Sequence, residues 1–184
     1  MTTRRPFHIA FLIAALCIAM PSALAAPPLV PKPLPEQVLS QAPGIRPLGR
    51  GRHVLWGIRV YDATLWVVGD QFAPVEPHAL DIESAKSVNA DTLVDTATKE
   101  MTRLKLGDKS QLAAWRQEMK RLIPNVKAGD QIVIFCPPDG RTLLYYNGHS
   151  QGEVEDTTLC PAVMNVWLHP EGKSKELRRS LLGQ

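Results

Sequence analysis

One stretch of the sequence combines cationic, hydroxyl and aromatic side chains that could together hold a small anion. It runs from residue 50 to residue 66 and contains Arg50, Arg52, Arg59, Tyr61, Thr64 and Trp66. An arginine guanidinium binds a carboxylate through two parallel hydrogen bonds, and Tyr, Leu and Trp side chains can form the apolar wall of a ligand pocket. We therefore predict a ligand site at Arg50, Arg52, Tyr61, Thr64 and Trp66. The alternative is that the arginines lie at a sheet edge, over aromatic residues of the core.

Other kinds of site are not indicated. The histidines beyond residue 25 are far apart, and neither a metal-binding spacing nor a calcium loop is present. Gly49-Arg50-Gly51 lacks the third glycine of a dinucleotide-binding turn, and neither a phosphate-binding loop nor a nucleophile elbow occurs. We therefore expect no metal and no cofactor.

The N-terminal residues resemble an export signal. Arg4 and Arg5 precede an apolar run from Phe7 to Met20, and Ala23-Leu24-Ala25 fits a cleavage site. The run is too short to span a bilayer, so we predict a signal peptide over residues 1–25, no membrane span after its cleavage, and a periplasmic or secreted protein. Thr3-Arg4-Arg5-Pro6-Phe7 also resembles a twin-arginine motif, which leaves the export route open.

The chain that remains after cleavage is nearly neutral and has two cysteines. Without Arg4 and Arg5 it has 19 basic and 18 acidic residues, an even mixture that argues against a nucleic-acid partner. Cys136 and Cys160 are an even pair in an oxidising compartment, where they would form either a disulfide or two buried thiols.

The pattern of apolar residues predicts segregated strands and helices. A proline-rich leader over 26–43, expected to be loosely held, precedes a domain over 44–184. We expect strands over 46–69 and 79–87, helices over about 90–105 and 110–123, and an antiparallel meander from 131 to about 155. A helix should start at Asp156 or Cys160, and another after Ser174. This order predicts an α+β fold.

Several segments, in order, resemble the bacterial chalcone isomerase-like proteins. They are Gly49–Trp66, Ala114-Trp115, Leu122–Asp130, Asn147-Gly148, Gly152–Asp156, Val166–Leu168 and Leu177–Gly183. The resemblance covers about residues 44–183 and implies a large antiparallel sheet with a layer of helices on one face. Plant members close a chalcone into a flavanone, and related members without that activity bind fatty acids in the same cleft through an arginine and a tyrosine.

The resemblance implies an arginine anchor but not the full catalytic set. The family's arginine falls close to Arg50 or Arg52, and Tyr61 stands where the family has a threonine that assists water. The family's tyrosine at the start of the first helix meets Asn89–Asp91, which contains no tyrosine. The residues therefore favour a protein that is not an enzyme.

Three functions follow from these observations. The first is a non-catalytic periplasmic protein that binds a small amphipathic acid, such as a fatty acid. The second is an intramolecular lyase or isomerase that acts on an enone or flavonoid-like compound. The third is an accessory protein of the cell envelope without a small ligand, for which a cleft filled by side chains would speak.

Overall fold

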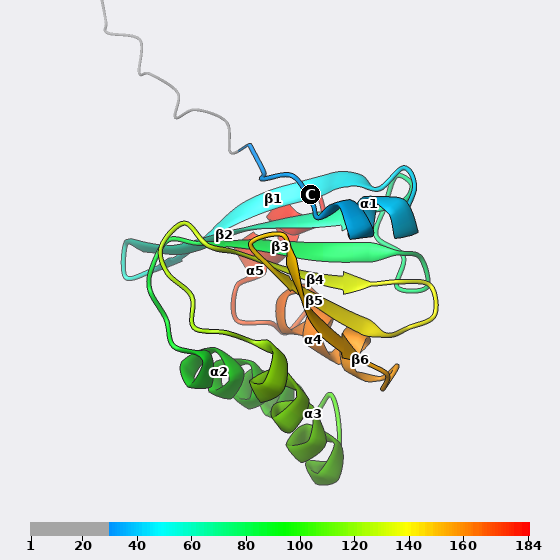
Figure 1. Cartoon of the computed structure of the whole chain (residues 1–184). Coiled ribbons are helices and arrows are strands. Elements are labelled where there is room, and N and C mark those ends of the chain that lie inside the picture. Colours follow the sequence, from blue (N-terminus) through cyan, green and yellow to red (C-terminus); the bar gives the residue numbers. More distant parts are fainter. Residues whose placement is uncertain (1–29) are drawn as a thin grey trace, which may run out of the picture.

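A six-stranded antiparallel sheet lies at the centre of residues 30–184, the part of the chain that the computed structural model describes (Figure 1). Its strands are β1 (Arg46–Leu55), β2 (Ile58–Val67), β3 (His78–Ser84), β4 (Gln131–Cys136), β5 (Thr142–Tyr146) and β6 (His149–Val154). Each strand pairs with the next one along the chain, in the order β1-β2-β3-β4-β5-β6. The predicted signal peptide and the first residues of the leader lie outside the described residues.

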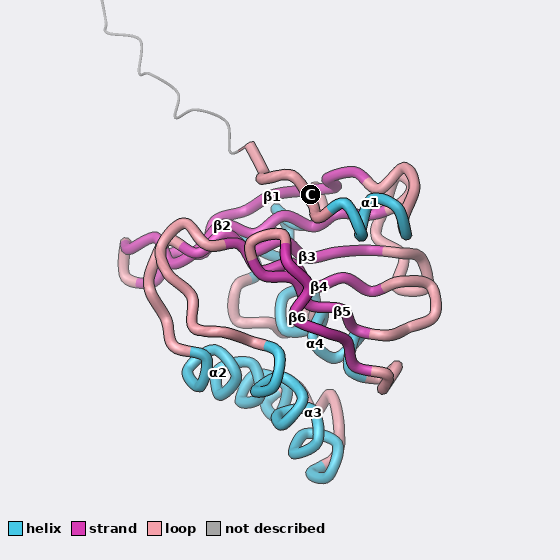
Figure 2. Tube along the Cα trace, viewed as in Figure 1, coloured by secondary structure: helices cyan, strands magenta, loops and turns pink. Residues whose placement is uncertain are grey.

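Four helices cover one face of this sheet. They are α2 (Ala90–Arg103), α3 (Lys109–Leu122), α4 (Leu159–Leu168) and α5 (Lys175–Leu181), and their apolar residues share one core with the strands. The short helix α1 (Glu36–Gln41) packs on the opposite face, in a smaller second core. Figure 2 shows the sheet in magenta with the helices around it in cyan. The predicted α+β class, with its layer of helices on one face, is confirmed.

The alternation of side chains along the strands assigns residues to the two faces. In β2, Ala63, Leu65 and Val67 are buried in the larger core that the four helices share. Successive side chains of a strand point to opposite faces, so Asp62, Thr64 and Trp66 belong to the face that carries α1. Residues that are neighbours in sequence therefore lie on different sides of the molecule.

The two long helices begin at side-chain caps that the sequence indicated. The Asn89 side chain accepts a hydrogen bond from the Thr92 N–H at the start of α2. Asp108 accepts one from the Gln111 N–H, and the Gln111 side chain accepts one from the Asp108 N–H, which completes a capping box at α3. Of the two caps proposed for this helix, Asp108 or Ser110, the structure has Asp108.

Two features differ from the sequence-based expectation. Strands were expected over 46–69 without an assigned turn, whereas Trp56 and Gly57 form a hairpin turn with φ of 49° and 78°. Because turns of this kind favour Asn or Gly, the tryptophan concealed the turn. The leader was expected to be loosely held, yet Leu34, Val38 and Ala42 are buried in the second core. The boundary of the domain at residue 44 stays a prediction.

No helix in residues 30–184 combines the length and the apolar character that crossing a membrane requires.

Candidate functional site

A cavity of about 490 Å³ lies between the sheet and the four helices. Its wall is mainly aliphatic, with Ile132 and Leu144 from the sheet, Leu93 from α2, Leu122 from α3 and Val163 from α4. Cavities that hold small ligands measure roughly 300–1,000 Å³ and are lined mostly by apolar side chains. The cavity therefore has the size and surface for a small, largely apolar ligand.

Tyr61 and Trp167 form a hydrogen-bonded pair in the cavity wall. The Trp167 Nε1–H donates to the Tyr61 hydroxyl oxygen at 3.0 Å, and both residues line the cavity. Burial raises the pKa of Tyr61 to about 12, with the Trp167 hydrogen bond acting in the opposite direction, so the phenol keeps its proton near neutral pH. Because Trp167 already fills one acceptor position of the oxygen, the phenol is left with a proton to donate to a ligand.

His53 stacks on the Tyr61 ring and extends the polar part of the wall. The two ring centroids are 4.9 Å apart and the planes are inclined by 22°. Burial lowers the pKa of His53, so its imidazole is neutral near pH 7. A neutral imidazole can donate one hydrogen bond and accept another, which suits recognition of a polar head group.

The cationic side chain in the described cavity wall is Lys173, and it is paired. Its ammonium lies 3.1 Å from Glu100 Oε2, while Arg103 donates to Glu100 Oε1 at 2.6 Å. The Arg103 hydrogen bond is the main cause that lowers the pKa of Glu100 to about 2, so Glu100 is an anion held by two cations. The Lys173 side chain is mostly exposed and could reach an anion at the edge of the cavity.

Thr142 places an unpartnered hydroxyl group in the wall. It is buried on the first residue of β5, and its Oγ1 has no hydrogen-bond partner among the described residues. A buried polar atom without a partner costs free energy. The hydroxyl therefore offers a second polar contact to a ligand in the cavity.

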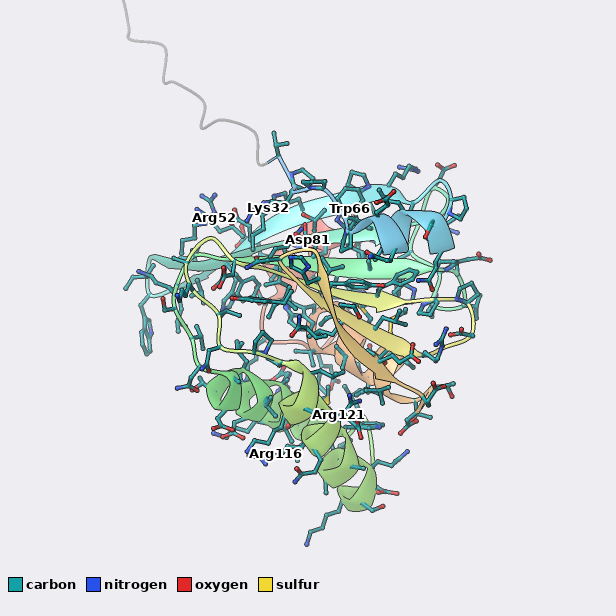
Figure 3. The ribbon with its side chains drawn as sticks, in the orientation of Figure 1. Lys32, Arg52, Trp66, Asp81, Arg116 and Arg121 are labelled. Atoms are coloured by element: carbon teal, nitrogen blue, oxygen red, sulfur yellow. A yellow bond between two sulfur atoms is a disulfide. The ribbon has the colours of Figure 1, made fainter. Side chains whose placement is uncertain are left out.

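Only Tyr61, of the five predicted ligand-binding residues, lies in the cavity wall. Arg50 and Arg52 lie on the opposite face, where Arg50 donates to Thr64 at 2.6 Å and to Glu83 at 2.7 Å. Arg52 donates to Asp62 at 2.8 Å, and Asp62 is almost fully buried. Trp66 packs against the second core. Figure 3 labels Arg52 and Trp66 on the side of the sheet away from α2 and α3.

The structure therefore separates the arginines from the cavity, and the ligand-binding role of these five residues stays a prediction. Strand alternation in the sequence could have shown that these five residues do not form one site, because Tyr61 cannot share a face with Thr64 or Trp66 in one strand. His53, Trp167, Thr142 and Lys173 were not predicted, because they come from three distant segments, around residues 53, 142 and 167–173, that only the fold brings together.

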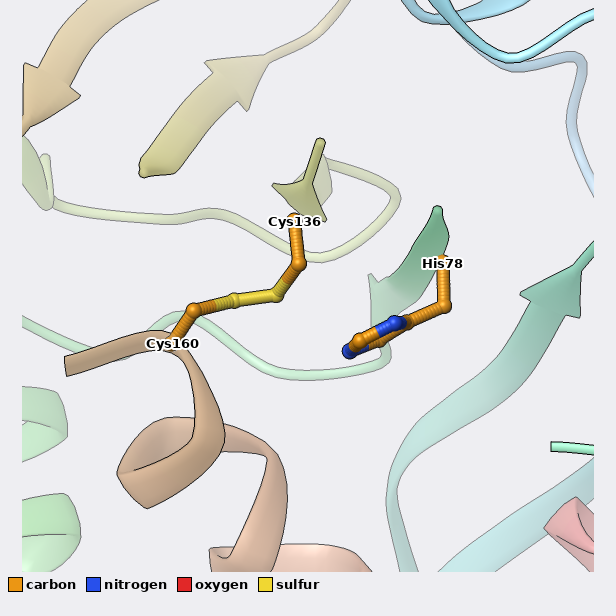
Figure 4. Close-up of side chains that lie close together, drawn as sticks. All are labelled: His78, Cys136 and Cys160. Atoms are coloured by element: carbon orange, nitrogen blue, oxygen red, sulfur yellow. A yellow bond between two sulfur atoms is a disulfide. The ribbon is translucent and has the colours of Figure 1, made fainter. Parts of the chain in front are cut away.

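Cys136 and Cys160 lie at disulfide-bonding distance, beside His78 (Figure 4). Their Cα atoms are 6.1 Å apart, within the range that disulfides span. The three side chains are buried and their ligand atoms are close together, but joined sulfur atoms leave no thiolate to bind a metal. The His78 Nδ1 lies 2.7 Å from the Glu76 carbonyl oxygen. The group is therefore a disulfide between β4 and α4 that packs beside a histidine.

Comparison with known proteins identifies the family. A family model described as "Chalcone isomerase-like" matches residues 51–183, and the chain belongs to this family. A crystal structure of a fatty-acid-binding protein from Arabidopsis thaliana is similar, with a TM-score of 0.62 and 18% sequence identity over 77% of this chain and 88% of that one. At this identity the similarity concerns the fold. No relative was found among curated protein sequences.

Proposed function

We propose that this protein binds a small amphipathic acid, such as a fatty acid, with the tail in the cavity, and that it does not act on the ligand as an enzyme. The aliphatic cavity of about 490 Å³ is the observation that carries the proposal. Burial of each methylene group contributes roughly 0.8 kcal/mol, so an alkyl chain would gain substantial free energy there. The fold shared with a fatty-acid-binding protein supports the same function.

The polar residues of the wall favour binding over catalysis. Tyr61 is a protonated donor at neutral pH, and Glu100 is held by Arg103 and Lys173. Among the described wall residues, Asp130 also accepts bonds from Tyr146 and Asn147. The Tyr61 hydroxyl can donate to a carboxylate head group, whereas Glu100 and Asp130 are already bonded and their pKa values are lowered, so neither is suited to transferring protons. The open cavity also argues against the accessory role without a ligand, which a filled cleft would have favoured.

The proposal assigns the head group to the Tyr61 hydroxyl. A hydrogen bond to a charged group contributes roughly 1.5–3 kcal/mol, so Tyr61→Phe should weaken acid binding about tenfold or more. The matched control is Tyr145→Phe, because Tyr145 is buried in the second core on the other face of the sheet. Binding is measured by titration of delipidated protein with saturated fatty acids of increasing chain length.

A second variant tests the tail. Ala97 lines the cavity from α2, and Ala97→Phe should exclude the longest acids while it leaves the circular dichroism spectrum unchanged. Native mass spectrometry of wild-type protein purified from cells should show a bound acid. A delipidated wild-type protein that takes up no acid of any chain length would overturn the proposal.

We also propose that the protein acts in the periplasm or outside the cell. The sequence of residues 1–25 supports export, and disulfides persist in oxidising compartments, which suits the Cys136–Cys160 pair. N-terminal sequencing of the protein recovered from its native cells should begin at Ala26. An N-terminus at Met1 in the cytoplasmic fraction would contradict export.

A further inference from the structure

The turn between β1 and β2 gathers exposed apolar side chains. Of the seven large apolar residues that are exposed in residues 30–184, four fall within five consecutive positions, namely Val54, Leu55, Trp56 and Ile58. Trp56 is 91% exposed. We call these four residues the hairpin tip. Apolar patches of this kind on a protein surface mark sites of interaction.

The hairpin tip projects beyond the rest of the sheet. The pairing of β2 with β3 begins at Tyr61, and the Val60 carbonyl accepts from the Ala85 N–H, so the residues from 54 to 59 pair only within the hairpin itself. Figure 1 shows this end of β1 and β2 extending past the neighbouring strands. A narrow, protruding hairpin can enter an apolar environment while the rest of the fold stays in water.

Trp56 has an unfavourable backbone conformation that no contact of its side chain with the described residues stabilises. Its φ of 49° lies in the left-handed region, which is unusual for a bulky residue and favours Asn or Gly. Packing does not compensate for this conformation, because almost the whole side chain faces solvent. Strained residues of this kind often belong to functional surfaces, which points to a partner for the indole.

The apolar surface of the hairpin tip continues into the cavity. Leu55 is about half exposed and also lines the cavity, together with His53 and Val60 from the base of the hairpin. The cavity therefore reaches the surface next to the tip. If the tip lies in an apolar environment, the apolar tail of a ligand could move from there into the cavity without crossing a polar surface.

Exposed cations surround the base of the hairpin. Arg52 and Arg59 flank the tip in β1 and β2. Lys86 follows Ala85, whose N–H donates to the Val60 carbonyl at 2.8 Å, so this lysine lies beside the start of β2. Lys86 is exposed, and no acidic partner of its ammonium is found within residues 30–184.

The nearby carboxylates are already bonded. Asp62 is buried beneath Arg52 and Arg59, so these three side chains together keep one net positive charge. Asp130 accepts bonds from the neutral side chains of Tyr146 and Asn147 and keeps its negative charge, but the charge of Lys127 acts on it. The charge that this end of the molecule presents to solvent is consequently basic. It complements the phosphate groups of anionic phospholipids.

We propose that the hairpin tip docks on a lipid bilayer that contains anionic phospholipids and sets the opening of the cavity against it. Tryptophan and aliphatic side chains partition to the boundary between head groups and acyl chains, and the flanking basic residues would meet the phosphates. Transfer of an acid between the bilayer and the cavity is the purpose of this docking. The transfer step rests on the proposed function, whereas the docking itself does not.

The docking can be tested with vesicles. The cores are formed by residues from Leu34 to Leu181, so a chain that begins at Ala26 retains the fold. We expect it to float with vesicles of phosphatidylethanolamine and phosphatidylglycerol, with a blue shift of tryptophan emission, and to bind vesicles of phosphatidylcholine more weakly. Trp56→Asn suits the turn and should reduce vesicle binding at least about tenfold.

A control separates the tip from exposed apolar residues in general. Val75 is 81% exposed and lies in the loop between β2 and β3, at the other end of β2 from the hairpin tip, so Val75→Asn should bind vesicles like the wild type. Equal vesicle binding by wild type and Trp56→Asn would overturn the docking. So would a dimer that depends on Trp56 and forms without vesicle binding, because the tip would then be an interface between copies of the chain.

A third measurement distinguishes docking from the proposed function. Trp56 does not line the cavity, so Trp56→Asn should bind a fatty acid in solution with wild-type affinity but take it up from vesicles at least about fivefold more slowly. Vesicle binding that depends on Trp56 in a protein that binds no acid would support docking and overturn transfer. Acid binding with no vesicle binding would overturn docking and leave the proposed function standing.

Discussion

Thr64 and Thr142 are both buried, but their hydroxyl groups have different surroundings. Thr64 accepts a hydrogen bond from Arg50 Nη1 at 2.6 Å on the face of the sheet that carries α1. The Oγ1 of Thr142 lies in the cavity wall without a partner among the described residues. The same substitution should therefore have opposite effects at the two positions.

The substitution of threonine by valine tests this difference. Thr142→Val removes an unsatisfied hydroxyl and should stabilise the delipidated protein by about 1 kcal/mol. Thr64→Val leaves a buried arginine N–H without its acceptor and should destabilise it by roughly 1–3 kcal/mol. Urea unfolding of the two variants beside the wild type measures both changes. A loss of stability in Thr142→Val would show that the hydroxyl has a partner in the empty protein.

The sequence could predict the chemical types at the candidate site but not the face on which each residue lies. Tyr61 was predicted and lines the cavity, whereas Arg50 and Arg52 point to the other face. The face of a β1 residue depends on its register with β2, which is irregular between Pro47 and Gly49 and again between His53 and Val54. Bulges of this kind depend on the packing of whole strands, and the sequence around the arginines does not reveal them.

At the scale of elements, the disulfide joins the end of β4 to the first turn of α4. Cys136 and Cys160 are 24 positions apart, and cross-linking a loop of this length stabilises a protein by roughly 3 kcal/mol in the chain-entropy description. Reduction should therefore lower the stability of the wild type by about this amount. The cavity wall should be affected as well, since Leu159 and Val163 of α4 belong to it.

Urea unfolding with and without a reductant measures the contribution of the disulfide. The double variant Cys136→Ala/Cys160→Ala should be less stable than the oxidised wild type and insensitive to the reductant. Equal stability of the wild type in both conditions would show that the two cysteines are not bonded in the purified protein.

Most elements were predictable because their signals are local. The caps of α2 and α3 and the Asn147-Gly148 turn each depend on a few neighbouring residues. The turn at Trp56-Gly57 was missed because its first residue has the wrong type for its conformation. Helix α1 was missed because its burial depends on a second core, formed with strands almost one hundred positions away.

At the scale of the whole molecule, the sheet separates the cavity from a network of polar side chains on its other face. The cavity and the four helices lie on one side. On the other side the segment before α1 crosses a network of buried polar residues: the Lys32 N–H donates to Glu83 at 3.2 Å, and Gln131 Nε2 donates to the Pro33 carbonyl at 3.3 Å. Figure 3 labels Lys32 and Asp81 on this side. Packing of the N-terminal segment thus depends on the state of this network.

Asp81 is the member of the network that should respond to pH. It is fully buried, its Oδ1 accepts from Gln131 Nε2 at 3.0 Å, and its Oδ2 has no partner among the described residues. Burial is the main cause that raises the pKa of Asp81 to about 7, from an ordinary value of 3.8. The Glu83 charge also raises it, while the Gln131 hydrogen bond and the charges of Arg50 and Lys32 lower it.

The raised pKa fixes the sign of the expected pH dependence. Between pH 3.8 and about 7 the folded state keeps the Asp81 proton and the unfolded chain loses it, so this contribution to stability is full below pH 3.8 and is lost as the pH rises through about 7. His53 and His78, whose pKa values are lowered by burial, oppose it at the acidic end of this range. A comparison with Asp81→Asn cancels these histidine contributions.

Asp81→Asn keeps an oxygen acceptor for Gln131 and removes the titrating group, so the difference in unfolding free energy between wild type and variant should fall steadily from about pH 5 to about pH 8. The matched control is Asp70→Asn, because the Asp70 side chain is fully exposed and its difference from the wild type should stay constant over this range. Urea unfolding across the range measures both differences. A difference for Asp81→Asn that does not change with pH would mean that water or a counter-ion keeps the buried carboxylate charged, and the N-terminal segment would then pack equally well on either side of neutrality.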